Sequence, residues 1–249
     1  MMQQKPKDTQ AHSMSNDLWG KALLEFFEGT GDGLIETETT HSEPEPFSMA
    51  YLFRNLEQLP KVEQVALQLA QGSILDIGCG AGAHLQILQN LQKEAWGIDT
   101  SAASIKVCQE RGFHNTDCRS FATEKRTFDT LLLLMNGSGI LAPITRLVGT
   151  LKQLGTLLNP GGCILLDSTD IAYLFPNKIP ERKRKMNNNY YGEVSFTVRY
   201  KNKKQTMPWL YLDAKTAKQA FEEAGFEVVF PCVDGDSYLL KATIKEPAL

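Results

Sequence analysis

Residues 73–84, with the sequence SILDIGCGAGAH, constrain the fold more strongly than any other part of the chain. A short apolar run leads into glycines at positions 78, 80 and 82, and leucines at helical spacing follow. Glycine lets the backbone approach a ligand where a Cβ atom would collide. A turn between a strand and a helix also directs the free N–H groups of the helix start toward that ligand. The segment therefore predicts a ligand-binding turn in an α/β fold.

Strands and helices are predicted to alternate around this turn. Short apolar runs predict strands, and segments with apolar residues at helical spacing predict the helices between them. The strands are expected at residues 73–78, 94–99, 113–118, 128–135 and 163–168, and the helices at 83–92, 101–112 and 144–158. Ser101 is expected to cap the second helix and Gly112 to end it. Alternation at this spacing predicts a parallel, doubly wound sheet.

The C-terminal part departs from this alternation. Residues 193–200 alternate apolar and polar side chains, so a β-hairpin is predicted at 192–212. A helix follows, with Asp213 as its cap and Gly225 as its stop. Two last strands, within 226–244, are joined so tightly that they must run antiparallel. The expected fold class is α/β, with a doubly wound, seven-stranded, mostly parallel sheet and an antiparallel last strand.

The composition excludes several classes of protein. The chain has 249 residues and a formal net charge of −3, so a globally basic, phosphate-binding surface is absent. Its five cysteines are scattered, without a C-x-x-C pair or a Cys/His cluster, and predict neither a metal site nor a disulfide framework. The N-terminus lacks an apolar signal sequence, and the longest strongly apolar run, at 130–135, is too short to span a bilayer. We therefore expect a soluble cytoplasmic protein without membrane contact.

Two stretches depart from the average composition. Residues 25–45 are acidic and poor in apolar side chains, which predicts an acidic loop. Residues 178–204 are basic and include Tyr190, Tyr191 and Phe196, a mixture that can stack bases and neutralise phosphates. A solvated hairpin face explains the same charges more simply, because the chain as a whole is acidic and shows no RNA-binding module. Nucleic acid is therefore not the expected partner.

The glycine turn by itself allows two kinds of ligand. Gly78, Gly80 and Ala83 match the G-x-G-x-x-A pattern of dinucleotide-binding turns. With Asp76 ahead of the glycines the pattern becomes D-x-G-x-G-x-G, which resembles motif I of the class I S-adenosylmethionine (SAM)-dependent methyltransferases. Asp99, at the end of the next predicted strand, suits ribose hydroxyls in either class and does not separate them.

Later motifs favour the methyltransferases. Asp117 lies where that family has an acid beside the adenine, the pair Phe128-Asp129 opens the fourth strand, and LLNPGGCILLD leads into the fifth. The antiparallel last strand is also similar to the family. The resemblance covers residues 60–175 well and residues 213–245 in outline. It implies the sheet order 3-2-1-4-5-7-6, SAM as the cofactor and S-adenosylhomocysteine (SAH) as its product.

The resemblance implies a SAM site at the carboxyl ends of the strands. Backbone N–H groups between Gly78 and Gly82 suit the methionine carboxylate, and Asp99 suits the ribose. Asp117 and the amide of Cys118 suit the adenine. The expected cofactor-binding residues are Asp76, Gly78, Cys79, Gly80, Gly82, Asp99, Thr100, Ser101, Asp117, Cys118, Met135 and Asn136. No metal is expected.

Other residues are candidates for closing the site or contacting the methyl acceptor. Asn136 follows the fourth strand, so it is a candidate catalytic or substrate contact, and a turn that needs glycines is the alternative explanation. Tyr51, Phe53 and Arg54 are lid candidates, with an ordinary amphipathic helix over 50–60 as the equal alternative. Possible substrate contacts in or before the hairpin are Tyr173, Tyr190, Trp209 and Tyr211.

These observations predict a division of the chain and a reaction. We expect an N-terminal tail, acidic loop and helical lid over residues 1–60, and a SAM-binding domain over 61–249 with a hairpin inserted at about 190–212. The expected function is methyl transfer from SAM to a small-molecule acceptor. An RNA or protein methyltransferase using the basic hairpin, a non-catalytic SAM-binding module and a dehydrogenase are the alternatives. The sequence predicts neither the acceptor atom nor the oligomeric state.

Overall fold

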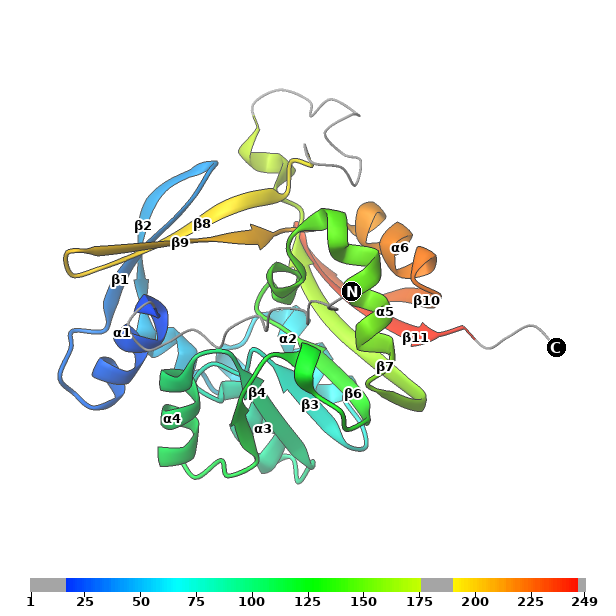
Figure 1. Cartoon of the computed structure of the whole chain (residues 1–249), viewed down its shortest axis with the longest axis horizontal. Coiled ribbons are helices and arrows are strands. Elements are labelled where there is room, and N and C mark those ends of the chain that lie inside the picture. The colour runs from blue at the N-terminus through cyan, green and yellow to red at the C-terminus, as the bar shows by residue number, and fades with distance from the viewer. Residues whose placement is uncertain (1–16, 176–189, 246–249) are drawn as a thin grey trace, which may run out of the picture.

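Two β-sheets organise the chain, of which the computed structural model describes residues 17–175 and 190–245. The larger sheet has seven strands and the smaller one has four. Figure 1 shows the smaller sheet, drawn in blue and yellow, extending away from the larger one. No helix within the described ranges is long and apolar enough to cross a membrane.

The seven-stranded sheet has the order β10-β11-β7-β6-β3-β4-β5, which confirms the predicted order. Its strands are β3 (Ile74–Ile77), β4 (Ala95–Asp99), β5 (Thr116–Cys118), β6 (Phe128–Leu133), β7 (Leu158–Thr169), β10 (Phe226–Asp234) and β11 (Ser237–Ile244). Strands β3 to β7 run parallel, and β11 runs antiparallel to both β7 and β10, as predicted. The carboxyl ends of the five parallel strands therefore meet at one edge, where open α/β sheets bind ligands.

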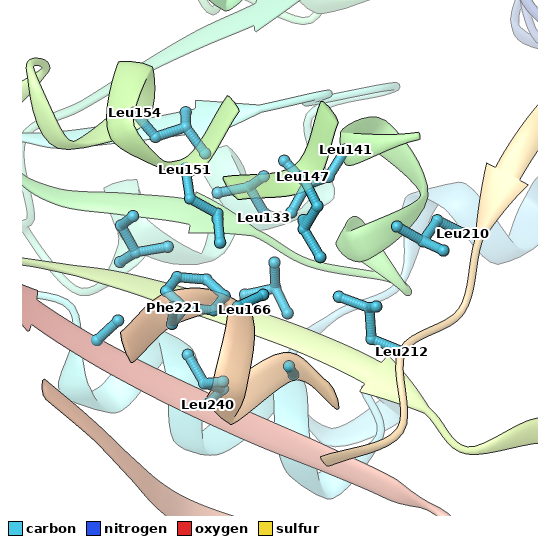
Figure 2. Packing of buried hydrophobic residues seen from close by; sticks show 14 of the residues in the cluster. Leu133, Leu141, Leu147, Leu151, Leu154, Leu166, Leu210, Leu212, Phe221 and Leu240 are labelled. Atoms are coloured by element: carbon cyan, nitrogen blue, oxygen red, sulfur yellow. The ribbon is translucent and has the colours of Figure 1, made fainter. Parts of the chain in front are cut away.

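Helices cover both faces of this sheet. They are α2 (Lys61–Leu69), α3 (Ala83–Asn90), α4 (Ala102–Glu110), α5 (Leu147–Gly155) and α6 (Ala214–Glu223). On one face, leucines of α5 and Phe221 of α6 meet the side chains of Leu133, Leu166 and Leu240, as Figure 2 shows. On the other face, α2 and α3 bury a second apolar cluster against the strands. The two layers confirm the doubly wound fold.

The helix ends follow the predicted caps in two places and differ in one. Ser101 caps α4 and Asp213 caps α6, each through a side-chain oxygen that accepts the backbone N–H three residues on, at 3.0 Å. The helix predicted over 144–158 is shorter than expected. It ends at Gly155, because Leu158 already pairs with β6 as the first residue of β7.

The smaller sheet corrects the prediction of an acidic loop over 25–45. Helix α1 (Leu18–Phe27) and strands β1 (Leu34–Thr39) and β2 (Ser42–Ser48) occupy this region. Strand β1 pairs antiparallel with β8 (Glu193–Tyr200), which forms the predicted hairpin with β9 (Lys203–Leu210). The hairpin is confirmed, but it forms only half of the four-stranded sheet. The other half, β1 and β2, precedes the larger sheet in sequence (Figure 1).

Charge pairing explains why so acidic a segment forms strands. The carboxylate of Glu38 on β1 lies 2.7 Å from the guanidinium of Arg199 and 3.4 Å from the ammonium of Lys204. Glu25 at the end of α1 lies 2.6 Å from the ammonium of Lys201. Each exposed pair contributes little, on the order of 0.2–1 kcal/mol. Together, however, the pairs place acidic side chains beside basic ones. Like charges on neighbouring strands would repel each other instead.

The segment between the smaller sheet and α2 is not the single amphipathic helix that one interpretation of residues 50–60 predicted. It forms two 3₁₀ turns, Met49–Phe53 and Leu56–Gln58. Extended backbone at Arg54 and Asn55 separates them. The side chain of Asn55 accepts the N–H of Gln58 at 3.1 Å, so it starts a new turn instead of continuing the first.

We predict that Ile35→Ala lowers the free energy of unfolding by roughly 2–4 kcal/mol, because the side chain is buried against α1 in the smaller sheet. Its neighbour Leu34 is 54% exposed, so Leu34→Ala is the matched control and should cost under about 1 kcal/mol. Denaturant unfolding followed by circular dichroism measures both. Equal losses would contradict this packing.

Candidate functional site

The glycine turn follows β3 and is bound to β4. Gly78, Gly80 and Gly82 have φ angles of +82°, +53° and +79°, which other residues adopt only at a cost. The N–H groups of Gly78 and Cys79 donate to the carbonyl of Ile98 at 2.8 and 3.1 Å. A Cβ atom added to Gly80 would meet no atom within 4 Å, so the turn faces open space there. The turn is therefore fixed in place and leaves room for a ligand beside Gly80.

Asp99, the last residue of β4, closes this arrangement. Its Oδ2 accepts the N–H of Gly80 at 3.0 Å, and its Oδ1 accepts the N–H of Ser101 at 2.8 Å. Burial raises the pKa of Asp99 to about 6, although the two N–H groups oppose the rise. Thr100, between Asp99 and Ser101 in the sequence, is exposed. Each carboxylate oxygen of Asp99 keeps a further lone pair, so a ligand can still bind there.

Asp117 and Cys118, at the end of β5, lie beside Asp99, which pairs in register with Cys118. The side chain of Asp117 is 51% exposed and forms an ion pair with Arg119. The guanidinium of Arg126 lies 3.8 Å from the same carboxylate. The structure thus brings Cys118 next to Asp99, while the carboxylate of Asp117 already has cationic partners that the motif did not reveal.

A chain of buried charged groups extends from Asp76. Its Oδ2 lies 3.7 Å from His84 Nδ1, and His84 Nε2 lies 2.8 Å from Glu63 Oε2. The guanidinium of Arg54 continues the chain, with Nη1 and Nη2 at 3.4 and 3.2 Å from the two carboxylate oxygens of Glu63. All four residues are buried, and Asp76 Oδ2 has no hydrogen-bond partner.

His84 is positively charged within this chain. Burial lowers its pKa, but the carboxylates of Asp76 and Glu63 outweigh burial and bring the pKa to about 10. The cluster therefore sets two cations, His84 and Arg54, against two carboxyl groups. Sequence analysis missed Glu63, although it shares the apolar face of α2 with buried residues. Across residues 17–175 and 190–245, no three His, Cys, Asp or Glu side chains are grouped as a metal ion would require.

The three lid candidates lie in different environments. Arg54 is only 7% exposed, and its guanidinium lies 3.7 Å from the ring centre of Tyr51. Tyr51 is 40% exposed. The ring of Phe53 is stacked on Phe27 of α1 with centroids 6.2 Å apart. Arg54 is therefore a buried residue that pairs with Glu63. A lid role for the three residues stays a prediction.

Met135 and Asn136 form a turn at the carboxyl end of β6. Both have left-handed backbone, with φ of +64° and +56°. Asn136 Oδ1 accepts the hydroxyl of Thr169 at 2.8 Å. The next N–H, of Gly137, donates to Asp167 Oδ1 at 3.1 Å, and burial raises the pKa of Asp167 to about 7. Sequence analysis did not single out Asp167, which ends the predicted strand motif 157–167.

The four aromatic candidates for substrate contact differ in their burial and contacts. Tyr190 is buried, and its hydroxyl donates to Asp213 Oδ2 at 2.8 Å, so it is a core residue. Tyr173 is 63% exposed. Trp209 lies against Gly139 in the turn after Asn136, so closely that a Cβ on that glycine would overlap the indole ring. Tyr211 is half-buried and packs against the apolar cluster that α5 and α6 form on the larger sheet.

Comparison with known proteins decides the family. A family model described as a methyltransferase domain matches residues 48–230. The solved structure of a SAM-dependent methyltransferase from Bacteroides fragilis, in complex with SAH, is 32% identical, with a TM-score of 0.84 over 94% of this chain and 97% of that one. This chain belongs to the class I SAM-dependent methyltransferases. Its cofactor is SAM.

More distant solved structures share the fold of this methyltransferase. The sugar N-methyltransferase KedS8 from Streptoalloteichus sp. is 16% identical, with a TM-score of 0.54 over 74% of this chain and 85% of its own. SAM-bound CalS10, an amino pentose methyltransferase from Micromonospora echinaspora, is 17% identical, with a TM-score of 0.50 over 73% and 87%. No curated protein sequence matches the chain.

We predict that the methyltransferase loses stability between pH 7.5 and 9 because of His84. Its pKa of about 10 when folded exceeds the unfolded value of 6.5, so the folded state holds the extra proton and stability falls as pH rises. The slope from this one group is at most about 1.4 kcal/mol per pH unit. His84→Gln should be less stable at pH 7.5 and show a flatter pH dependence.

The exposed His114 provides the control for this titration. His114→Gln should keep the wild-type slope of unfolding free energy against pH. A wild-type slope in His84→Gln would show that the buried cluster does not hold the proton.

Proposed function

We propose that this methyltransferase binds SAM across the glycine turn and transfers the methyl group to a small-molecule acceptor. The observation that carries the proposal is the hydrogen bond from Gly80 N–H to Asp99 Oδ2, beside the open space at Gly80. It holds backbone donors and a half-buried carboxylate together at the ligand-binding edge of the sheet. When bound, SAM supplies an activated methyl group and a neutral thioether as the leaving group.

Several features of the chain fit the parts of SAM. Backbone N–H groups before α3 suit its carboxylate, because a helix start favours an anion. Asp76 Oδ2, buried without a hydrogen-bond partner, suits its ammonium group. Asp99 suits the ribose hydroxyls, and Asp117 with the backbone of Cys118 suits the adenine. The further cofactor contacts that we propose are Gly78, Cys79, Gly82, Thr100, Ser101, Met135 and Asn136.

The acceptor is proposed to bind at the end of β6. Two consecutive non-glycine residues with left-handed backbone, Met135 and Asn136, each store strain on the order of 1–3 kcal/mol, as residues at functional sites often do. The nearby carboxyl group of Asp167 has a pKa of about 7, which suits a group that takes a proton from an arriving hydroxyl or amine. Trp209, with Tyr173 and Tyr211, is the proposed apolar side of the acceptor site.

A small molecule is favoured over nucleic acid because the basic hairpin is largely neutralised. Lys201 binds Glu25, and both Arg199 and Lys204 bind Glu38. A nucleic-acid surface needs cations that are available to phosphates. Two of the distant structural relatives, CalS10 and KedS8, are named as methyltransferases of an amino pentose and of a sugar, which supports the same class of acceptor.

A cytoplasmic location is supported by the cysteines. Cys79, Cys108, Cys118, Cys163 and Cys232 are all free thiols in the structure. Persisting free thiols are typical of a reducing compartment. We therefore propose that methyl transfer takes place in the cytoplasm.

We predict that Asp99→Ala weakens SAH binding roughly 100-fold, because hydrogen bonds to a charged carboxylate are worth about 1.5–3 kcal/mol each. Isothermal titration calorimetry with SAH measures the effect. Asp234→Ala, at the exposed turn between β10 and β11, is the control and should bind SAH as the wild type does. Unchanged affinity in Asp99→Ala would overturn the proposed cofactor site.

Methyl transfer itself is tested with SAM labelled in the methyl group. The protein is incubated with separate small-molecule, RNA and protein fractions of a cell extract, and we expect label in the small-molecule fraction. Label in the RNA or protein fraction would overturn the proposed acceptor class. Binding of SAM without transfer to any fraction would support a non-catalytic module.

A further inference from the structure

Asp17 combines two roles that a single carboxylate rarely has at a helix start. Its Oδ1 caps α1 by accepting the N–H of Gly20 at 2.8 Å. Its Oδ2 is buried and has no hydrogen-bond partner, and the residue as a whole is only 8% exposed. The cap therefore accounts for one oxygen and leaves the other unexplained.

Gly20 brings this unpaired oxygen next to α4. A Cβ atom at position 20 would lie 2.1 Å from Asp17 Oδ2 and 2.3 Å from Ser101 Oγ. Only a glycine therefore allows the start of α1 to pack this closely on the start of α4. The contact places the orphan oxygen at the carboxyl end of β4, where Asp99 lies.

The groups around Asp17 Oδ2 do not provide its donor. The charge of Asp17 raises the pKa of Asp99, after the larger effect of burial. Both also act on the thiol of Cys118, whose pKa is raised mainly by burial. Ser101 Oγ accepts the N–H of Ser104, and it is not hydrogen-bonded to Asp17 Oδ2. Asp17 Oδ2 thus lies close to Ser101 without a hydrogen-bond donor, and the backbone N–H of that serine donates to Asp99 Oδ1.

A buried acceptor without a donor costs about 1–3 kcal/mol, and most buried polar groups in proteins are paired. A ligand with donors that reach both carboxylates would supply the missing partner. A ribose has two adjacent hydroxyls, each with one O–H donor. Resting on the cofactor site proposed above, we propose that Asp17 is a second ribose-binding carboxylate, which accepts one hydroxyl of SAM while Asp99 accepts the other.

The smaller sheet positions this carboxylate. Gln205 on β9 accepts the N–H of Leu18 at 2.7 Å, directly after Asp17. At the other end of α1, Glu25 Oε2 accepts from Tyr200 and Lys201 at 2.5 and 2.6 Å. Helix α1 is thereby fixed between α4 and the hairpin, so the ribose is bound by both the core domain and the N-terminal segment.

Asp17→Asn and Asp17→Ser separate the two roles of the side chain. Both replacements keep a capping oxygen for Gly20 and remove the second carboxylate oxygen. Calorimetry with SAH should show about 10- to 100-fold weaker binding in both variants, while the midpoint of denaturant unfolding stays at or above the wild-type value. Asp32→Asn, at an exposed aspartate after α1, is the matched control and should bind SAH normally.

The 2′-deoxy and 3′-deoxy analogues of SAH test the contact directly. The analogue that lacks the hydroxyl bound by Asp17 should bind the wild type at least tenfold more weakly than SAH, and Asp17→Asn should not weaken it further. Equal losses for SAH and both analogues in Asp17→Asn would overturn the contact.

Asp99→Ala distinguishes the two proposals in the same titration. Wild-type affinity in Asp17→Asn together with a large loss in Asp99→Ala would overturn the role of Asp17 and leave the cofactor site standing. Wild-type affinity in both variants would overturn the cofactor site itself.

Discussion

The pairing of β1 with β8 is the interaction on which the arrangement around the cofactor edge depends. It joins Glu36 to Arg199 in register and brings Glu38 beside the same arginine, across a sequence separation of 161 residues. An isolated two-stranded hairpin is marginally stable in water, so β8 and β9 need this third strand. Once the four strands have assembled, they hold α1 against α4, and α1 places a carboxylate beside Asp99.

Much of the fold could be predicted from the sequence because its signals are local. The strand-turn-helix at the glycines, the caps Ser101 and Asp213 and the tight last turn each depend on residues close in sequence. The acidic strands at 34–48 could not be recognised in this way. Their alternation is masked by glutamates, and the cations that pair with Glu38 lie more than 150 residues later in the sequence, on β8 and β9.

The candidate site likewise contains features that local motifs predict and features that depend on residues distant in sequence. The neighbourhood of Gly80, Asp99, Ser101 and Cys118 follows from the motif and from strands that end at one edge. The motif could not show that Asp117 would be shared with arginines. Three acids of the site are withdrawn from water: Asp76 and Asp167 are buried, Asp99 is half-buried, and Asp76 Oδ2 has no hydrogen-bond partner. Such an arrangement costs stability when empty, and it is offset by a ligand that brings donors or positive charge.

Two segments distant in sequence form the smaller sheet. This limits the order in which the molecule can assemble. Residues 34–48 leave the ribosome before residues 193–210, so β1 has no β8 to pair with until most of the chain has been made. Until then β1 and β8 are open strand edges, the kind of surface that seeds aggregation. In the finished protein the same late contacts are expected to open first, ahead of global unfolding. A ligand held by α1 would then be released at a rate set by local opening of this sheet, while the glycine turn stays folded.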